Sequence, residues 1–125
     1  MVVMDTCAMI ELAKTECRLS RATLKKIQEG AYILSISFAE IACLVRLNRL
    51  KLSTSLEDFY KAHVQIPHFE IIKIGVEEWF DYVHLDWQTH KDPADRLITA
   101  FAIKRELPIV TTDKQMKKFY KHVIW

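Results

Sequence analysis

Glycine and proline are scarce in this sequence, with only two glycines and three prolines among 125 residues. No segment is dominated by glycine, serine or any other single residue type, so linkers, disordered tails and internal repeats find no support. Half of the residues are hydrophobic, which at this length suits one domain with a substantial core. We therefore expect residues 1–125 to form a single domain.

The sequence also has few cysteines, no long apolar run and little resemblance to a targeting leader. The three cysteines (Cys7, Cys17 and Cys43) cannot all pair within one chain, and no Cys and His pair has zinc-ligand spacing, so we expect reduced thiols. The apolar N-terminus lacks a basic leader and is interrupted by Asp5 and Glu11, so it does not match the pattern of a signal peptide. No apolar stretch reaches the roughly 18 residues that a membrane span requires. We expect a cytoplasmic protein that makes no use of a membrane.

Short apolar runs typical of buried strands alternate with segments of helical spacing. This alternation predicts an α/β fold of three layers, α/β/α, around a mostly parallel central sheet of about five short strands. The predicted strands cover residues 2–4, 32–34, 69–74, 107–110 and 123–125. The predicted helices cover residues 6–13, 20–30 and 37–45, a segment that begins at Ser53 or Thr54 and runs to 64, residues 76–85, and the segment from 93.

Two aspartates follow predicted strands directly. Asp5 comes after the first strand and Asp113 after the strand that contains Ile109 and Val110. The carboxyl ends of parallel strands meet at one edge of a sheet, where sites gather, so we expect both carboxylates at that edge. Each aspartate could equally cap the helix that follows it.

Two further carboxylates belong to predicted helices. Glu40 borders the apolar stripe of a helix that we expect Ser37 to open, and an ionised carboxylate there is costly unless it is paired or bound to a metal. A salt bridge to an arginine is the simpler explanation. Asp92 and Pro93 are typical of a helix start, which places Asp95 in the first turn. A pure capping role for both aspartates is again the alternative.

If these four carboxylates converge, they repel one another strongly, and a stable ionised cluster calls for divalent cations. A ligand set of oxygens without His or Cys favours Mg²⁺ or Mn²⁺ over zinc. Such an ion neutralises phosphate charge and activates a water molecule. The residues therefore predict hydrolysis of phosphodiester bonds.

Four segments in this order and spacing resemble the PIN domains, and most closely the VapC-type toxins of prokaryotic toxin–antitoxin pairs. The resemblance spans essentially the whole chain. The segments are MDTCA at residues 4–8, SFAEI at 37–41, HKDPADR at 90–96 and PIVTTD at 108–113.

This resemblance implies a Mg²⁺- or Mn²⁺-dependent endoribonuclease that cleaves tRNA, rRNA or mRNA, inhibits translation, acts as a homodimer and is neutralised by a VapB-like antitoxin in its active-site groove. The residues that it implies as catalytic and metal-binding are Asp5, Glu40, Asp95 and Asp113, and those that it implies as supporting are Thr6, Thr111, Asp92 and Arg96. Arg96 would brace the acidic cluster or touch phosphate, with a plain salt bridge as the simpler role, and His90 has no assigned task. Two positions depart from the family. Cys7 stands where asparagine or serine is common, and Asn48 stands where many members have glycine.

Basic residues near the end of one predicted helix and in the locally basic last stretch are candidates for RNA binding. The helix dipole alone would favour the first group, and a solvated face is the usual role of the second. The candidates are Arg46, Arg49, Lys114, Lys117 and Lys118. The net charge of +2 is too small to indicate nucleic-acid binding by itself.

Three alternatives remain beside the nuclease. A non-catalytic PIN-like module that binds RNA or a partner protein has no need of four repelling carboxylates. A haloacid dehalogenase-type phosphatase needs a second aspartate where this chain has Cys7. A phosphoacceptor receiver domain needs an acidic pair, of which Met4-Asp5 supplies one member.

Overall fold

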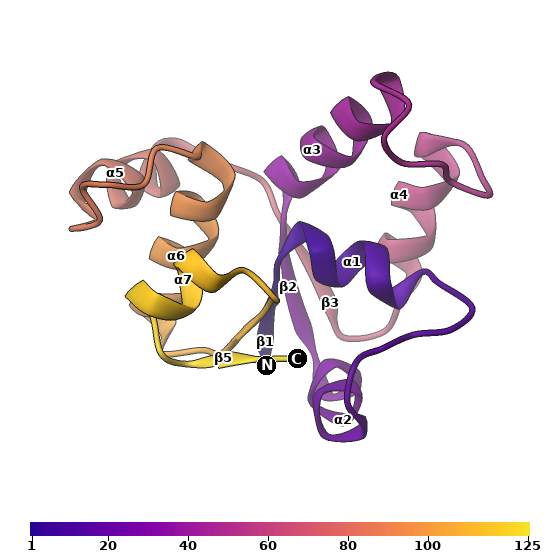
Figure 1. The fold of residues 1–125 in the computed structure, drawn as a ribbon, viewed down its shortest axis with the longest axis horizontal. Helices are drawn as coiled ribbons and strands as arrows, with labels where there is room; N and C mark the ends of the chain where they lie inside the picture. Colours follow the sequence, from indigo (N-terminus) through magenta and orange to yellow (C-terminus); the bar gives the residue numbers. More distant parts are fainter.

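The computed structural model describes residues 1–125 and contains one sheet of five strands (Figure 1). The strands are β1 (Val2–Met4), β2 (Ala31–Leu34), β3 (Phe69–Ile72), β4 (Ile109–Val110) and β5 (Val123–Ile124). Their order is β3-β2-β1-β4-β5, and every neighbouring pair is parallel. The predicted α/β class with a mostly parallel five-stranded sheet is confirmed, and the sheet is in fact parallel throughout.

Seven helices cover this sheet. They are α1 (Thr6–Leu12), α2 (Arg21–Glu29), α3 (Ser35–Arg46), α4 (Leu56–Gln65), α5 (Val76–His84), α6 (Pro93–Arg105) and α7 (Lys114–Phe119). In Figure 1, α1, α3 and α4 lie on one side of the strands, and α5, α6 and α7 lie on the other. None of the helices is both long and apolar enough to cross a membrane.

Each face of the sheet has its own hydrophobic core. Val2 and Met4 belong to the core beneath α1, α2 and α4, whereas Val3 belongs to the core that α6 and α7 cover. Successive side chains of a strand point to opposite faces. A strand covered on both faces must therefore be apolar at every position, which explains the continuous run at the start of the chain.

Two helix starts differ from the prediction. Helix α3 begins at Ser35 rather than Ser37, because β2 leads into it without a loop, and Ser37 lies buried within its first turn. Helix α4 begins after Ser55, whose Oγ accepts a hydrogen bond from the backbone N–H of Asp58 at 3.1 Å. The predicted start at Ser53 or Thr54 is therefore wrong by one or two residues.

The strand order determines where a site can form. The chain builds β1, β2 and β3 outward in one direction and then returns to add β4 and β5 on the other side of β1. In parallel sheets a crevice opens beyond the carboxyl ends of the strands at such a reversal. Here that crevice lies beyond β1, between the two groups of helices.

Candidate active site

Asp5 ends β1 and lies buried at the bottom of this crevice. Its Oδ1 accepts the backbone N–H of Thr6 at 2.6 Å, so Asp5 caps α1 as the local sequence predicted. Its Oδ2 accepts the hydroxyl of Thr111 at 2.5 Å and the thiol of Cys7 at 3.3 Å. Burial raises the pKa of Asp5, and these hydrogen bonds offset part of that rise.

Asp113 lies at the end of the neighbouring strand β4 and caps α7, with its Oδ1 accepting the N–H of Met116 at 2.7 Å. Thr111 connects the two strand ends, because its hydroxyl accepts the N–H of Asp113 at 3.0 Å and donates to Asp5. The negative charge of Asp113 contributes to the raised pKa values of Asp5 and Asp95. Asp113 therefore both caps α7 and belongs to the group of neighbouring carboxylates.

Glu40 reaches the crevice from α3 and is half-buried. Its Oε2 accepts a short hydrogen bond from the hydroxyl of Thr6. No arginine or lysine pairs with it, so the salt bridge considered from the sequence is excluded. Burial and the charges of Asp92, Asp5 and Asp95 raise the pKa of Glu40 to about 7, against the opposing effect of Thr6.

Asp95 lies in the first turn of α6, where the Oδ1 of Asp92 accepts its backbone N–H at 3.0 Å. Asp92 therefore caps the helix, whereas the Asp95 side chain bonds elsewhere: its Oδ2 lies 2.6 Å from Nε2 of His90. Burial, followed by the charges of neighbouring carboxylates, raises the pKa of Asp95 to about 6 although His90 opposes the shift.

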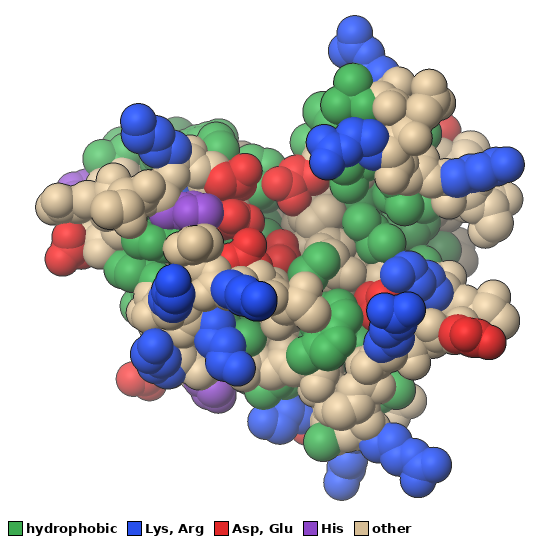
Figure 2. All heavy atoms as spheres, viewed as in Figure 1, with side chains coloured by type: hydrophobic (Ala, Val, Ile, Leu, Met, Phe, Trp, Pro, Cys, Tyr) green, Lys and Arg blue, Asp and Glu red, His purple; other side chains and the backbone are tan.

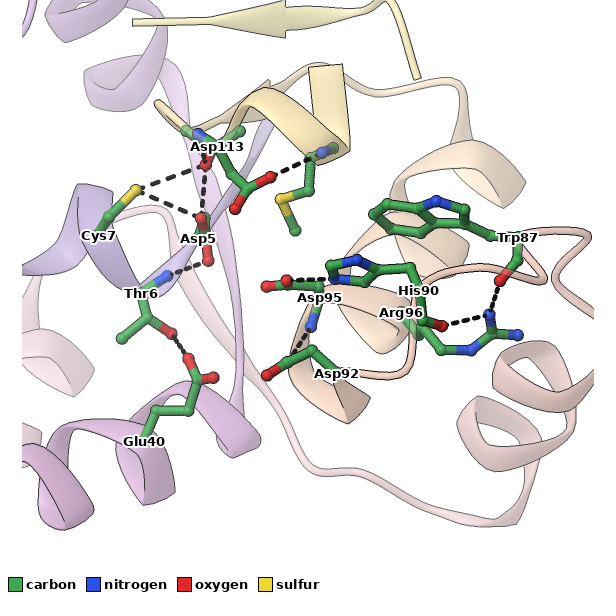
Figure 3. Close-up of polar contacts among 12 residues, drawn as sticks. Asp5, Thr6, Cys7, Glu40, Trp87, His90, Asp92, Asp95, Arg96 and Asp113 are labelled. Atoms are coloured by element: carbon green, nitrogen blue, oxygen red, sulfur yellow. Dashed lines mark hydrogen bonds and ion pairs between the residues drawn. The ribbon is translucent and has the colours of Figure 1, made fainter. Parts of the chain in front are cut away.

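Together these side chains form one acidic hollow. Figure 3 shows Asp5, Thr6 and Glu40 on one side and Asp95 on the other, with Asp113 above. Asp5, Glu40 and Asp95 line a cavity of about 540 Å³ whose remaining wall includes Ile10, Leu44, Leu47 and Arg49. In Figure 2 acidic side chains gather in the hollow between the two groups of helices, and basic side chains occupy the surface around it.

The chemistry of this donor set fits a hard divalent cation. Burial and mutual repulsion raise the pKa values of Asp5, Glu40 and Asp95, and no lysine or arginine pairs with these side chains. As the side chains lie, no three His, Cys, Asp or Glu residues are close enough together to hold a metal ion. Mg²⁺ typically needs only one or two direct carboxylates and keeps several waters, so a loose oxygen cluster is compatible with it.

The salt bridge considered for Arg96 is absent. Its guanidinium is buried and forms no ion pair; it donates hydrogen bonds to four backbone carbonyls of the segment before α6. These carbonyls belong to Tyr82, Leu85, Trp87 and His90. Arg96 therefore holds a loop in place and does not touch the acidic hollow (Figure 3). The five fixed N–H donors of a guanidinium suit this task, which no residue pattern indicated.

The predicted RNA-binding residues lie on two elements that flank the hollow. Arg46 is in the last turn of α3 and Arg49 lines the cavity. Lys114, Lys117 and Lys118 are exposed on α7. None of the five is in a salt bridge.

His90 is the residue that sequence reasoning missed. It lies five positions before Asp95, in a loop, and its partner could not be inferred from helical spacing. Its position beside the motif that carries Asp95 was the only available signal.

In a comparison with known protein families, the model of the PIN domain matches residues 2–122. The chain belongs to the PIN-domain family. No curated protein matches it in sequence. Among solved structures, this PIN domain is similar to FitAcB from Neisseria gonorrhoeae, with 22% identity, a TM-score of 0.69, and coverage of 100% of this chain and 97% of that chain.

Two other similar structures are each 18% identical to this PIN domain and cover 100% of it. One is a toxin–antitoxin complex from Klebsiella pneumoniae, with 97% of that chain covered and a TM-score of 0.63. The other is VapBC2 from Rickettsia felis bound to a DNA fragment from its promoter, with 98% covered and a TM-score of 0.67. At these identities the likeness shows a shared fold.

Proposed function

We propose that residues 1–125 act as one PIN domain that hydrolyses RNA phosphodiester bonds with Mg²⁺ or Mn²⁺, as the toxin of a toxin–antitoxin pair in the cytoplasm. The observation that carries the proposal is the convergence of carboxylates from β1, α3, α6 and the end of β4 on one hollow, without a lysine or arginine partner. A binding module has no need of such mutual repulsion.

In this proposal Asp5, Asp95 and Asp113 hold the cation, with Glu40 at its border. When bound, the cation would supply charge neutralisation for the phosphate and make a water molecule more acidic. Thr111 holds Asp5 in place, and Thr6 orients Glu40. Glu40 is half-buried beside the hollow and has no cationic partner, so in its ionised form it would accept a proton from the attacking water.

The surroundings of the hollow support a polyanionic substrate and a protein partner. The basic side chains of α7 and of the end of α3 can hold RNA backbone on either side, whether in tRNA, rRNA or mRNA. The apolar wall of Ile10, Leu44 and Leu47 beside the carboxylates suits a VapB-like antitoxin segment that carries apolar and basic side chains. Toxin–antitoxin complexes contain chains with this fold, which supports such a partner. A homodimer is a further part of the proposal.

The test is an RNA cleavage assay with the purified chain and either Mg²⁺ or Mn²⁺. We expect cleavage by the wild type, and its loss in folded Asp5→Ala and Asp95→Ala proteins and in excess EDTA. Glu29→Gln, on the exposed end of α2, serves as the control and should cleave normally. Undiminished activity in EDTA would refute the metal site, and a wild type that binds RNA without cutting it would favour the non-catalytic module.

A further inference from the structure

His90 lies in a loop and contacts Asp95, one of the carboxylates of the acidic hollow. The loop joins α5 to α6, and Nε2 of His90 lies 2.6 Å from Oδ2 of Asp95. Both side chains are 19% exposed. This contact uses one oxygen of Asp95 and leaves Oδ1 without a hydrogen-bond partner in the protein.

Aromatic stacking fixes the plane of the His90 ring. The ring lies on the indole of Trp87, with centroids 4.0 Å apart and planes 9° apart. The opposite side of this stack is closed by Phe119 of α7, whose ring is 4.8 Å from Trp87 and inclined by 8°. Trp87 is buried. The imidazole therefore has a rigid support that is anchored in another helix.

Arg96 fixes the backbone of the same loop. Its guanidinium donates to the carbonyls of Trp87 and His90, and also to two carbonyls near the end of α5. Arg96 is the immediate neighbour of Asp95 on α6. The loop that carries His90 and the turn that carries Asp95 are thus held to one another by a buried side chain, which keeps the distance between them constant.

We propose that His90 is a positioning residue: its Nε2–H fixes Oδ2 of Asp95 and so presents Oδ1 in a constant direction to the divalent cation. The proposal rests on the proposed function, because it assigns Asp95 to the metal. Outer-shell partners of this kind orient a metal ligand, and their loss typically lowers metal affinity about 10- to 100-fold. The competing role is a plain loop anchor, in which stacking and not the hydrogen bond matters.

Two substitutions separate these roles. His90→Phe keeps a flat ring for Trp87 and removes the donor, whereas His90→Gln keeps an N–H donor of similar reach and removes the ring. His90→Leu replaces the phenylalanine variant if that protein fails to fold. His84→Phe is the matched control, because His84 is exposed on α5 and its Nδ1 contacts only the carbonyl of Phe80.

The experiment titrates Mn²⁺ into each metal-free protein and follows unbound Mn²⁺ by electron paramagnetic resonance, with thermal melting as the check on folding. We expect His90→Phe to raise the Kd for Mn²⁺ about 10-fold, and His90→Gln and the His84→Phe control to stay within about threefold of the wild type. At saturating Mn²⁺ the KM for RNA of His90→Phe should equal that of the wild type.

An unchanged Kd in folded His90→Phe protein would overturn the inference while the proposed function stands. A loss of Mn²⁺ affinity in folded His90→Gln protein that His90→Phe does not share would also overturn it, because the ring and not the donor would then matter. A wild type that binds no Mn²⁺ would refute the proposed function and this inference together. Tight binding by the wild type that is lost in Asp95→Ala and weakened in His90→Phe is the result that supports both.

Discussion

Replacing Glu40 with glutamine should stabilise the metal-free protein at alkaline pH. The pKa of Glu40 is raised from 4.5 to about 7, chiefly by burial, so the fold favours the protonated carboxyl. The contribution of this group to stability is fully present below pH 4.5 and is lost as the pH rises through about 7. Glutamine is neutral at every pH and can still accept the hydroxyl of Thr6.

The size of the effect follows from the shift. A rise from 4.5 to about 7 corresponds to about 3 kcal/mol if it is fully expressed. Glu40 is only half-buried, and solvent screens part of this cost. We therefore expect the Glu40→Gln protein to exceed the wild type by about 1–2 kcal/mol in free energy of unfolding at pH 8, and to equal it near pH 4.5.

The measurement is urea denaturation of both proteins in EDTA across this pH range. Added Mg²⁺ should narrow the difference at pH 8, because the cation stabilises the ionised carboxylates of the wild type. Glu57→Gln, at an exposed position in the first turn of α4, is the matched control and should show no such gain. A Glu40→Gln protein that is less stable than the wild type at pH 8 would refute the reasoning.

Three other predictions concern separate parts of the molecule. Arg96→Lys should lower the free energy of unfolding by about 2–3 kcal/mol in a denaturation assay, because one ammonium cannot serve four carbonyls; an unchanged stability would contradict the role of Arg96 in the loop. Neutralising Lys117 and Lys118 together should reduce the slope of log K for RNA binding against log salt by about 1.5; an unaltered slope would exclude α7 from the RNA surface. Mn²⁺ at about 100 times its Kd should raise the melting temperature of the wild type by about 10 °C, an increase that Asp5→Asn should abolish.

The sequence was informative where short segments decide structure. The apolar runs at residues 2–4 and 107–110 predicted buried strands, and both occur in the structure, the second only at Ile109–Val110. Ser20, Asp92 and Asp113 act as the helix caps that their positions indicated. The start of α3 was misplaced because its first turn has no capping side chain, and the strand before it shares its apolar character.

The candidate site was only partly accessible from sequence. The positions of Asp5 and Asp113 at the ends of parallel strands predicted a shared edge, and the pairing of β1 with β4 confirms it. The predicted salt bridge of Arg96 was wrong, because its four acceptors are backbone carbonyls, which no residue type indicates. The His90 ring stacks on Trp87, which in turn stacks on Phe119. No local sequence pattern indicates such a stack of three rings.

The sequence by itself thus determined the alternation of strands and helices, the helix caps and the identity of the acidic residues, because each of these depends on neighbours within a few positions. The tertiary structure alone decided that the carboxylates of Asp5, Glu40 and Asp95 line one cavity with Asp113 beside Asp5, and that burial raises the pKa values of the first three. The reason is that convergence depends on strand order. β4 pairs with β1 across more than a hundred residues, and only that non-local pairing brings the separate acidic segments to one edge of the sheet.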